Sequence, residues 1–491
     1  MPLDRRRLIQ TGGATGAATL AASLGLAQPA LAGSAQHRSR RGTPRLFPPL
    51  QSGAGDLLAL PEGFSYEVVA VSGETTMRHG SKTPERPDGT LVVAAHHGYR
   101  LIQNHESSPG GGVPVPLTEG TVYDAGCLGG GCTVIQTDHH GRRVSEWVGL
   151  SGTYSNCAGG PTPWGAWLTC EETEAKAGTG TLTKDHGYVF EVFADQPSAQ
   201  SPLPIQAWGR FAHEAVVIEP SRQRAYLTED DSGPTGLFYR WTAPAGRRLR
   251  PRIAESFGPN AGTLEALAVL ANDGTLLPDL AYVTSAEIGR PFKTRWIEVD
   301  DRHATTTSLR KQPFASNATH SKKLEGAWGD DEGAYFVASF AFGSADLPAN
   351  ATRHDGQLWY YRYDDRTLTL QAYFPYNELL HDESAGYESR FGPSTDLVFD
   401  GPDGCHVSPY GSLVLTEDGN TFNHTLSWSR ELGAQAIARN LIVLETSSAG
   451  GNVYSEMTGP CFSPDGKVLF VNVQEPGHTF AVRGPWQRYL G

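Results

Sequence analysis

The sequence predicts an all-β protein, specifically a β-propeller of about five or six blades with insertions. Three observations support this fold class. Glycine (57 residues) and proline (33 residues) make up nearly a fifth of the 491 residues, which disfavours a helical bundle. Short apolar runs alternate with turns along most of the chain. An apolar run that ends in acidic residues recurs along the sequence, as expected of a repeat architecture.

The repeated unit is a strand that closes in carboxylates. It occurs at residues 100–106, 166–172, 225–231, 280–287, 412–418 and 468–475, and a seventh run at 334–339 ends in serine. The irregular spacing implies that blades carry insertions. Only two segments, 263–271 and 433–440, have the pattern of an amphipathic helix longer than about two turns.

The propeller geometry gives the repeated acids a meaning. The innermost strands of a propeller line a central channel, so residues at their ends converge on one mouth. Several carboxylates in one place cannot all ionise at low dielectric without cations. Hard oxygen ligands suit Ca²⁺, and iron of higher valence is a further option. For a single blade, an acid that caps a turn on the solvent face is the better explanation, but acids at the matching place in five blades favour the channel.

The N-terminal segment 1–32 has the pattern of a twin-arginine signal peptide. Arg5, Arg6 and Arg7 precede a weakly apolar stretch, and the small residues Ala30 and Ala32 mark a cleavage site. An ordinary secretory signal is the alternative. Residues 33–55 are predicted to be a flexible mature N-terminus and residues 56–491 the propeller domain. The expected partner of the signal is the twin-arginine export machinery.

Composition and charge exclude other classes of protein. The net charge is −13, from 53 acidic and 40 basic residues, so binding to nucleic acid or anionic lipid is not expected. A cation-binding protein and a merely soluble acidic surface both fit that charge. No segment after the signal is apolar over the 18 or so residues that span a bilayer, so stable membrane insertion is not expected. Of the six cysteines, Cys127 and Cys132 are close enough in sequence for a local bridge, and no CxxC pair suggests zinc.

Several stretches resemble the PhoX-type exported bacterial phosphatases. The most specific is residues 157–172, which contain Thr-Pro-Trp-Gly and Thr-Cys-Glu-Glu. Shorter matching pieces are residues 103–106, 209–215, 226–231, 324–328 and 459–466. Members of that family are twin-arginine-exported propellers with a mixed iron and calcium centre. The resemblance therefore implies a periplasmic or extracellular phosphatase that hydrolyses small phosphomonoesters, and we expect it to be a monomer.

The resemblance also implies a set of metal ligands. It assigns Cys170 to iron, although a buried small apolar role for that cysteine is the alternative. It assigns Glu214 and Glu325 to the metals as well. Further candidate ligands are Glu106, Glu171, Glu172 and Asp231.

Three residues are candidates for catalysis rather than ligation. Asn104 either hydrogen-bonds a phosphate oxygen or orders the loop that carries Glu106. His213 either donates to a ligand or packs beside Glu214. Lys323 stands where these phosphatases have a phosphate-clamping arginine, and lysine supplies charge without a bidentate fork. Phosphate binding is therefore expected to be weaker, or the substrate to differ.

Two other functions fit the same fold. One is a calcium-dependent propeller lactonase or esterase, which would not need Cys170. The other is a non-catalytic propeller whose acids hold structural calcium. The sequence contains no Gly-x-Ser-x-Gly elbow and no phosphate-binding Gly-x-x-x-x-Gly-Lys-Ser/Thr loop. A metal-based reaction is thus favoured over a serine nucleophile, and fold alone does not decide among the three functions.

Overall fold

The computed structural model describes residues 45–195, 200–233, 235–341, 355–375, 399–419, 422–446 and 452–491. The residues from Arg45 to Gly491 form one unit. The predicted signal peptide (1–32) lies outside the described residues, as do residues 33–44 of the predicted flexible N-terminus. Residues 45–55 are part of the described unit, because strand β1 (Leu50–Gln51) pairs with strand β2 (Leu58–Pro61).

The first three blades follow one another in chain order. Blade 1 consists of β4 (Pro87–Ala95), β5 (Gly98–His105), β6 (Gly130–Thr137) and β7 (Arg143–Thr153). Blade 2 consists of β8 (Asn156–Pro161), β9 (Trp167–Glu171) and β10 (Val189–Val192). Blade 3 consists of β11 (His213–Ile218), β12 (Arg224–Glu229), β13 (Gly236–Thr242) and β14 (Thr263–Leu270). Neighbouring strands within each blade are antiparallel.

The second three blades complete the ring. Blade 4 consists of β17 (Leu324–Gly329), β18 (Gly333–Ala341), β19 (Asp355–Arg362) and β20 (Thr367–Phe374). Blade 5 consists of β21 (Pro402–Val407), β22 (Leu413–Glu417), β23 (His424–Ser429) and β24 (Gly433–Asn440), and β2 and β1 extend it. Blade 6 consists of β27 (Met457–Phe462), β28 (Val468–Val473), β29 (His478–Arg483) and β3 (Ser65–Val71).

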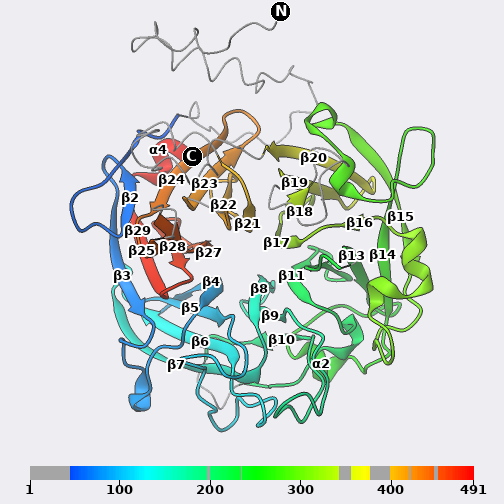
Figure 1. The fold of residues 1–491 in the computed structure, drawn as a ribbon, viewed down its shortest axis with the longest axis horizontal. Coiled ribbons are helices and arrows are strands. Elements are labelled where there is room, and N and C mark those ends of the chain that lie inside the picture. The colour runs from blue at the N-terminus through cyan, green and yellow to red at the C-terminus, as the bar shows by residue number, and fades with distance from the viewer. Residues whose placement is uncertain are drawn as a thin grey trace, which may run out of the picture. The chain divides into compact units, whose positions relative to one another are not determined.

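The innermost strands close a ring around a common centre (Figure 1). Strand β4 packs against β8, β8 against β11, β11 against β17, β17 against β21, β21 against β27, and β27 against β4. Strand β3, from the N-terminal part of the chain, pairs with the C-terminal strand β29, so segments from both ends of the domain close blade 6. The predicted propeller is confirmed, and in the described part of the chain the ring has six innermost strands.

The remaining elements are connections on the outside of the blades. Strand β15 (Pro291–Glu298) pairs with both β14 and β20 and so joins the outer edges of blades 3 and 4. Shorter pieces are β16 (His320–Ser321), β25 (Val443–Thr446), β26 (Asn452–Tyr454), α2 (Ile253–Ser256) and α4 (Trp486–Leu490). No helix in the described ranges has both the length and the apolar character to cross a bilayer.

The two predicted amphipathic helices are wrong. Residues 263–270 and 433–440 form strands β14 and β24. Each is paired on both sides along at least part of its length, β14 with β13 and β15, and β24 with β23 and β2. A helical pattern of about eight residues is too short to hold a helix against such pairing.

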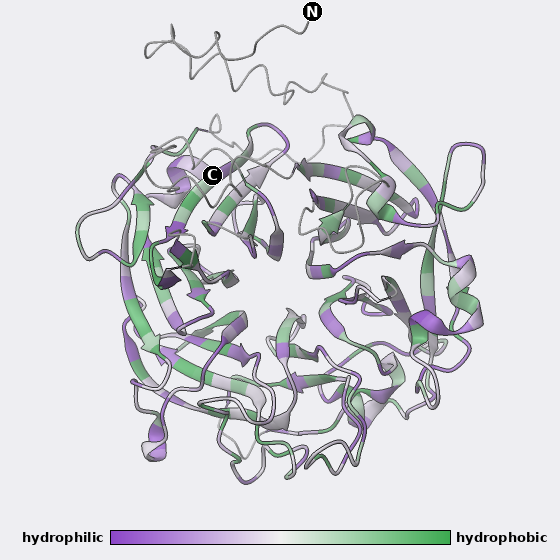
Figure 2. Cartoon of the chain, viewed as in Figure 1, coloured by the Kyte–Doolittle hydropathy of each residue, from purple (hydrophilic) through white to green (hydrophobic). Residues whose placement is uncertain are grey.

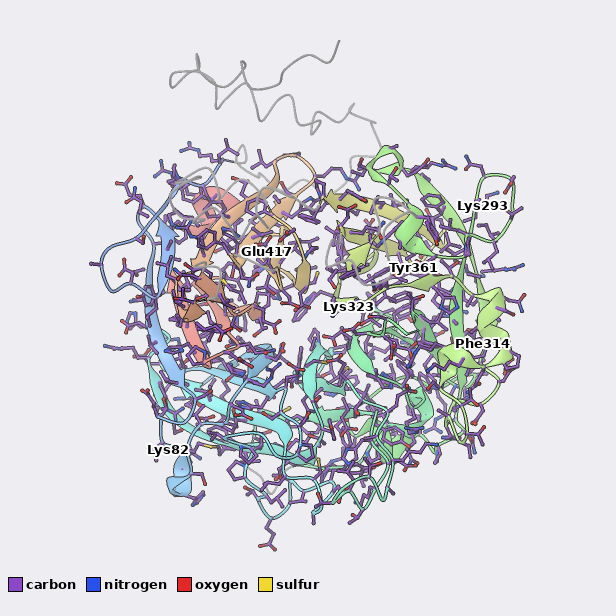
Figure 3. The ribbon with its side chains drawn as sticks, in the orientation of Figure 1. Lys82, Lys293, Phe314, Lys323, Tyr361 and Glu417 are labelled. Atoms are coloured by element: carbon purple, nitrogen blue, oxygen red, sulfur yellow. The ribbon has the colours of Figure 1, made fainter. Side chains whose placement is uncertain are left out.

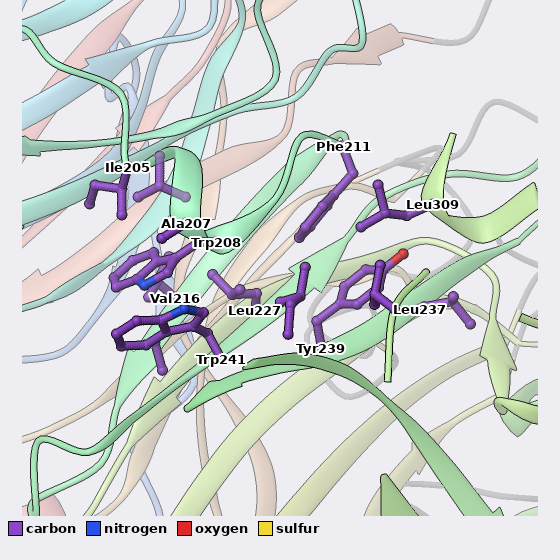
Figure 4. Packing of buried hydrophobic residues seen from close by; sticks show 14 of the residues in the cluster. Ile205, Ala207, Trp208, Phe211, Val216, Leu227, Leu237, Tyr239, Trp241 and Leu309 are labelled. Atoms are coloured by element: carbon purple, nitrogen blue, oxygen red, sulfur yellow. The ribbon is translucent and has the colours of Figure 1, made fainter. Parts of the chain in front are cut away.

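Hydrophobic side chains fill the space between neighbouring blades. Figure 2 shows long hydrophobic stretches along the blade strands. Between blades 2 and 3, Trp208, Trp241, Phe211 and Tyr239 are fully buried, and the two indole rings lie 6.1 Å apart (Figure 4). Burying one large apolar side chain contributes about 1.5–3 kcal/mol. Packing of this kind holds the blades, and hence the ends of their inner strands, in fixed relative positions.

Candidate metal centre

Each innermost strand is interrupted by a β-bulge close to its first residue. In β11, His213 pairs with Glu229 and Val216 pairs with Leu227. The two residues between them, Glu214 and Ala215, therefore oppose only one residue of β12. The same irregularity occurs in β4, β8, β17, β21 and β27. The first bulge residues, which we call the bulge ring, are Asp88, Cys157, Glu214, Glu325, Asp403 and Gly459.

The second bulge residue is small in the first five blades because neighbouring bulges approach closely. These residues are Gly89, Ala158, Ala215, Gly326 and Gly404. A Cβ on Gly89 would lie 2.8 Å from the Cα of Ala158 in the next blade, and one on Gly326 would lie 2.8 Å from the carbonyl oxygen of Asp403. A bulge re-aims the side chain that it carries. The close approach brings the re-aimed side chains of successive blades together.

Two groups of ligand atoms result. One atom each from Cys157, Glu172 and Glu214 lies within 4.8 Å of the others, and so does one atom each from Glu214, Glu325 and Asp403. Four of these five side chains belong to the bulge ring, and Glu172 follows directly after β9. Glu214 belongs to both groups. The two groups are thus adjacent, and one carboxylate is positioned to serve both.

Further acids surround these groups at the ends of the second strands. Glu106, Glu172, Asp230 and Asp418 follow directly after β5, β9, β12 and β22. These ends and the starts of the innermost strands lie on the same side of the ring, which we call the mouth. Carboxylates from different blades therefore meet there, as the repeated sequence unit predicts.

Burial and mutual repulsion govern the ionisation of this cluster. Burial raises the pKa of Glu172, Glu214 and Asp403 well above the usual range, and neighbouring carboxylates raise it further. Burial also raises the pKa of Asp230, to about 7, with a further contribution from Glu325. The pKa of the Cys157 thiol is raised by burial and then by Glu214. Without cations, these groups would hold protons that a metal ion would displace.

The donor set fits a pair of different cations. Oxygen ligands alone, as in Glu214, Glu325 and Asp403, suit a hard ion such as Ca²⁺. A thiol beside two carboxylates, as in Cys157, Glu172 and Glu214, suits a transition metal such as iron better than calcium. The residues therefore fit the mixed centre that the sequence resemblance implies.

Two basic side chains also reach the mouth. The Lys323 Nζ lies 3.0 Å from Asp230 Oδ2 and 2.9 Å from Glu325 Oε1, next to the ring centre (Figure 3). Burial alone would lower the pKa of Lys323, but the two carboxylates outweigh it and hold the pKa far above its usual value. Arg86 donates to Glu106 over 2.7 Å. Lys323 and Arg86 both immediately precede a bulged strand, and both have a left-handed backbone with φ of 50° and 49°.

Three of the predicted ligands lie away from these groups. Cys170 is fully buried in the apolar cluster between blades 2 and 3, and it belongs to neither ligand group found among the described residues. The carboxylate of Glu171 hydrogen-bonds the ring of His186 over 2.6 Å and accepts from the backbone N–H groups of Gly187 and Tyr188. Asp231 pairs with Arg310 over 2.5 Å. The side chains of Cys157, Glu172 and Asp230 lie at the mouth instead.

The two other predicted catalytic residues hold the structure around the site. The side-chain amide of Asn104 donates to the carbonyls of Cys157 and Ala158, each over 2.7 Å. Its oxygen accepts from the Cys132 thiol and the Trp167 indole. Asn104 thereby fixes the bulge that carries Cys157 and keeps no hydrogen-bonding capacity for a phosphate.

His213 points into the core and not at the mouth. Its ring is fully buried and stacks on Phe211 with a centroid distance of 3.5 Å. Its Nε2 lies 3.2 Å from the carbonyl oxygen of Gly209. Burial lowers the pKa of His213 to about 3, so the ring is neutral at physiological pH.

Residues at the mouth that were not among the predicted site residues include Asp88, Cys157, Asp230 and Asp403, as well as Arg86 and Asp418. For Asp88, Cys157 and Asp403 a sequence signal exists. Near the start of each of the first five innermost strands, an acid or a cysteine is followed by glycine or alanine. All six cysteines are free thiols, so the suggested Cys127–Cys132 bridge is absent. The Cys132 thiol instead donates to Asn104.

A small cavity lies among the bulges. Its volume is about 30 Å³, and Asp88, Asp403, Trp167 and Trp328 are part of its lining. That is room for a few water molecules and not for an organic substrate. A substrate that uses the bulge ring is therefore expected to bind at the mouth.

Comparisons with known proteins agree with the fold. A family model for alkaline phosphatase PhoX matches residues 45–477. Among solved structures, the chain is similar to Pseudomonas fluorescens PhoX in complex with vanadate, a transition state analogue, with 17% sequence identity and a TM-score of 0.59. That match covers 90% of this chain and 98% of the Pseudomonas chain. At this identity the structural likeness establishes the fold alone.

Other solved structures match less well. A gluconolactonase from Xanthomonas campestris is 10% identical with a TM-score of 0.36, over 92% of this chain and 100% of its own. The PQQ domain of a pyranose dehydrogenase from Coprinopsis cinerea is 10% identical with a TM-score of 0.34, over 87% of this chain and 97% of its own. A search of curated proteins gave no match.

Proposed function

Because the chain belongs to the alkaline phosphatase PhoX family and is therefore a phosphomonoester hydrolase, we propose that its reaction takes place at the mouth on a centre of iron and calcium. Membership confirms the resemblance and the enzyme class predicted from the sequence. The observation that carries the metal proposal is the pair of ligand groups that share Glu214. Cys157, Glu172 and Glu214 would hold iron. Glu214, Glu325 and Asp403 would hold calcium.

The metals and the protein have separate roles in this proposal. When bound, such ions supply Lewis-acid charge for phosphoryl transfer. The protein supplies fixed ligands on rigid strands, and its packed channel confines the substrate to the mouth. Glu106 and Asp230, which lie beside the ligand groups, hold the basic side chains of Arg86 and Lys323 in place.

Lys323 is proposed to bind the substrate phosphate. An ammonium group has three N–H donors, and two of them are directed at Asp230 and Glu325. The third is left to donate to a phosphate oxygen at the mouth. The two carboxylates keep the ammonium charged throughout the pH range in which the enzyme would work. Lysine gives a point charge and not a fork, which supports a modest affinity for phosphate.

The place of action follows from the N-terminal segment and remains part of the proposal. Residues 1–32 support export through the twin-arginine route, which moves folded proteins. The enzyme would then act as a monomer on small phosphoesters in the periplasm or outside the cell.

The experiment that tests the function uses the purified full-length protein. We expect it to contain iron and calcium by elemental analysis and to hydrolyse p-nitrophenyl phosphate. Removal of both metals should abolish hydrolysis, and return of iron with calcium, but not of calcium alone, should restore it. A fully loaded protein that cleaves a lactone but no phosphomonoester would contradict the proposal, and calcium without iron would contradict the assignment of Cys157.

A further inference from the structure

The residue that opposes each bulge has a special position in the ring. In blades 1 to 5 it is Asn104, Cys170, Thr228, Val337 or Thr416. A bulge removes ladder hydrogen bonds, so the backbone groups of the bulge need other partners. The opposing side chain is close enough to provide them. Asn104, for example, donates to the bulge of the following blade, at Cys157 and Ala158.

Thr228 bonds two bulges at once. Its Oγ1 accepts from the backbone N–H of Ala215 over 2.8 Å, within its own blade. The same hydroxyl donates to the backbone carbonyl of Glu325 over 2.9 Å, in the next blade. Thr416, in the corresponding place in blade 5, accepts from the N–H of Gly404 in its own bulge.

The two bulges that Thr228 joins carry acids of the proposed calcium group. Glu214 directly precedes Ala215, and Glu325 is itself the residue whose carbonyl accepts the hydrogen bond. Their carboxylate oxygens lie within 4.8 Å of each other. Like charges at this distance repel each other, so the free protein tends to separate the two strands when both groups are ionised. Thr228 is completely buried and opposes that separation through the backbone.

We propose that Thr228 is a positioning residue that sets the spacing of Glu214 and Glu325 before any ion binds. This inference rests on the proposed function, because it assigns metals to those two carboxylates. Groups behind the ligands commonly change metal affinity by 10–100-fold when they are lost. We therefore expect the effect of Thr228 to fall on metal affinity and turnover and not only on folding.

The fold contains a matched control. Thr319 is also buried, and its hydroxyl also accepts one backbone N–H, that of Val269 over 2.8 Å. It also donates to one backbone carbonyl, that of Leu277 over 2.7 Å. These partners belong to the outer strand β14 and the segment after it. Thr319→Val therefore removes the same two hydrogen bonds as Thr228→Val but joins no bulges.

The experiment compares both valine variants with wild type. We measure thermal midpoint without metal, retention of iron and calcium against a competing chelator, and kcat and KM for p-nitrophenyl phosphate. Both variants should lower the midpoint to a similar extent. Only Thr228→Val should weaken calcium retention, by about 10–100-fold, and lower kcat more than it changes KM. Thr228→Ser keeps the hydroxyl, so its calcium retention and its kcat should match those of wild type.

Thr228→Cys provides a second variant in case valine prevents folding. A thiol is a weak hydrogen-bonding group of similar size, so it should give an intermediate loss of calcium retention. Wild-type metal retention in Thr228→Val or in Thr228→Cys, or an equal loss in Thr319→Val, would overturn the positioning role while the proposed function stands. A wild-type protein that binds neither ion would overturn the proposed function and this inference with it.

Discussion

Blades 3 and 6 have the same kind of bulge but different side chains at the corresponding positions of the mouth. Blade 3 places Glu214 in the bulge ring and Asp230 after its second strand. Blade 6 has the same kind of bulge, with Gly459 in the ring, and Gln474 after its second strand. The Gln474 amide donates to Asp88 over 3.0 Å and to Glu106 over 2.8 Å. Blade 3 thus adds two acids to the mouth at these two positions, whereas blade 6 places a glycine and an amide there. The acid of blade 6, Glu456, directly precedes β27, and burial and the neighbouring carboxylates raise its pKa.

The difference between blades 3 and 6 shows which features belong to the fold and which belong to the metal site. Gly459 has a φ of 57°, and a Cβ there would lie 2.2 Å from the carbonyl oxygen of Asp88. An acid cannot occupy that place, although the bulge itself forms. The bulge is therefore a property of the propeller, whereas metal binding depends on which side chains the bulges carry.

The largest expected effect is the loss of the acid that both ligand groups share. Glu214→Gln should lower kcat/KM by about three orders of magnitude, equivalent to about 4 kcal/mol of transition-state stabilisation. It should also lower the content of both metals, because an amide is a weaker ligand than a carboxylate. Steady-state kinetics and elemental analysis measure these changes.

A control for this variant lies on the outside of the same blade. Glu265→Gln removes an acid of β14 that pairs with Arg240 over 2.6 Å. It should keep wild-type kinetics and metal content. Equal losses in both variants would show that Glu214 acts through folding and not through metal binding.

Gln474→Glu tests whether the residue that follows the second strand of blade 6 must be neutral. The change replaces two donated hydrogen bonds to Asp88 and Glu106 with repulsion between carboxylates. The free energy of unfolding at pH 7 should fall by about 3 kcal/mol without added metal, as for loss of hydrogen bonds to charged groups. Calcium should recover part of it. Unchanged stability in urea unfolding would mean that the two hydrogen bonds donated by the amide do not stabilise that side of the mouth.

The contact between blades 5 and 6 should respond to acid through His406. Its buried Nε2 accepts from the Phe462 N–H of blade 6 over 3.2 Å, and burial lowers its pKa to about 3. The unfolded chain binds a proton near pH 6.5 that the folded protein excludes. Stability from this group is therefore full above pH 6.5 and falls as the pH decreases toward 3, by about 2 kcal/mol between pH 7 and pH 5.

His406→Asn measures that contribution. The variant keeps an acceptor for the Phe462 N–H but does not titrate in this range. Its stability should decrease by about 2 kcal/mol less than that of wild type between pH 7 and pH 5, as measured by urea unfolding at each pH. Parallel pH profiles for the two proteins would be inconsistent with a neutral histidine at this contact.

The smallest expected effect concerns Lys323. Lys323→Met should raise KM for a phosphomonoester about tenfold, equivalent to about 1.4 kcal/mol, and leave the metals bound. Calcium retention should not fall, because Asp230 and Glu325 lose a competing positive charge. Lys323→Arg should lower KM, since a guanidinium can form a bidentate pair with phosphate. A methionine variant with wild-type KM would remove Lys323 from the substrate site.

Much of the fold followed from the repeated strand-and-acid unit, but the exact ligands did not. The unit predicted a propeller and a mouth rich in acids because strand ends must meet there. Along a strand, however, successive side chains alternate between faces. A shift of one residue along the strand therefore decides which of two adjacent acids faces the mouth, Glu171 or Glu172 in blade 2 and Asp230 or Asp231 in blade 3. The bulges set that phase, and they depend on contacts between blades that sequence periodicity does not record.

The missed ligands have a related cause. Asp88 and Asp403 are each followed by glycine, which in a sequence is typical of a turn and not of a ligand. Cys157 has no acidic neighbour in the sequence. Cys170 stands within Thr-Cys-Glu-Glu and was therefore predicted to be the iron ligand. The structure instead places Cys170 opposite the bulge that presents Cys157.

The two cysteines provide the most direct test of the proposed metal centre. Cys157→Ser and Cys170→Ser each replace one buried thiol of blade 2, on neighbouring strands. The measurement is iron content together with the visible absorption band of an iron–thiolate bond. We predict that Cys157→Ser loses the band and most of the iron and activity, while Cys170→Ser keeps all three. Loss of the band in Cys170→Ser and its retention in Cys157→Ser would contradict the centre proposed for this ring.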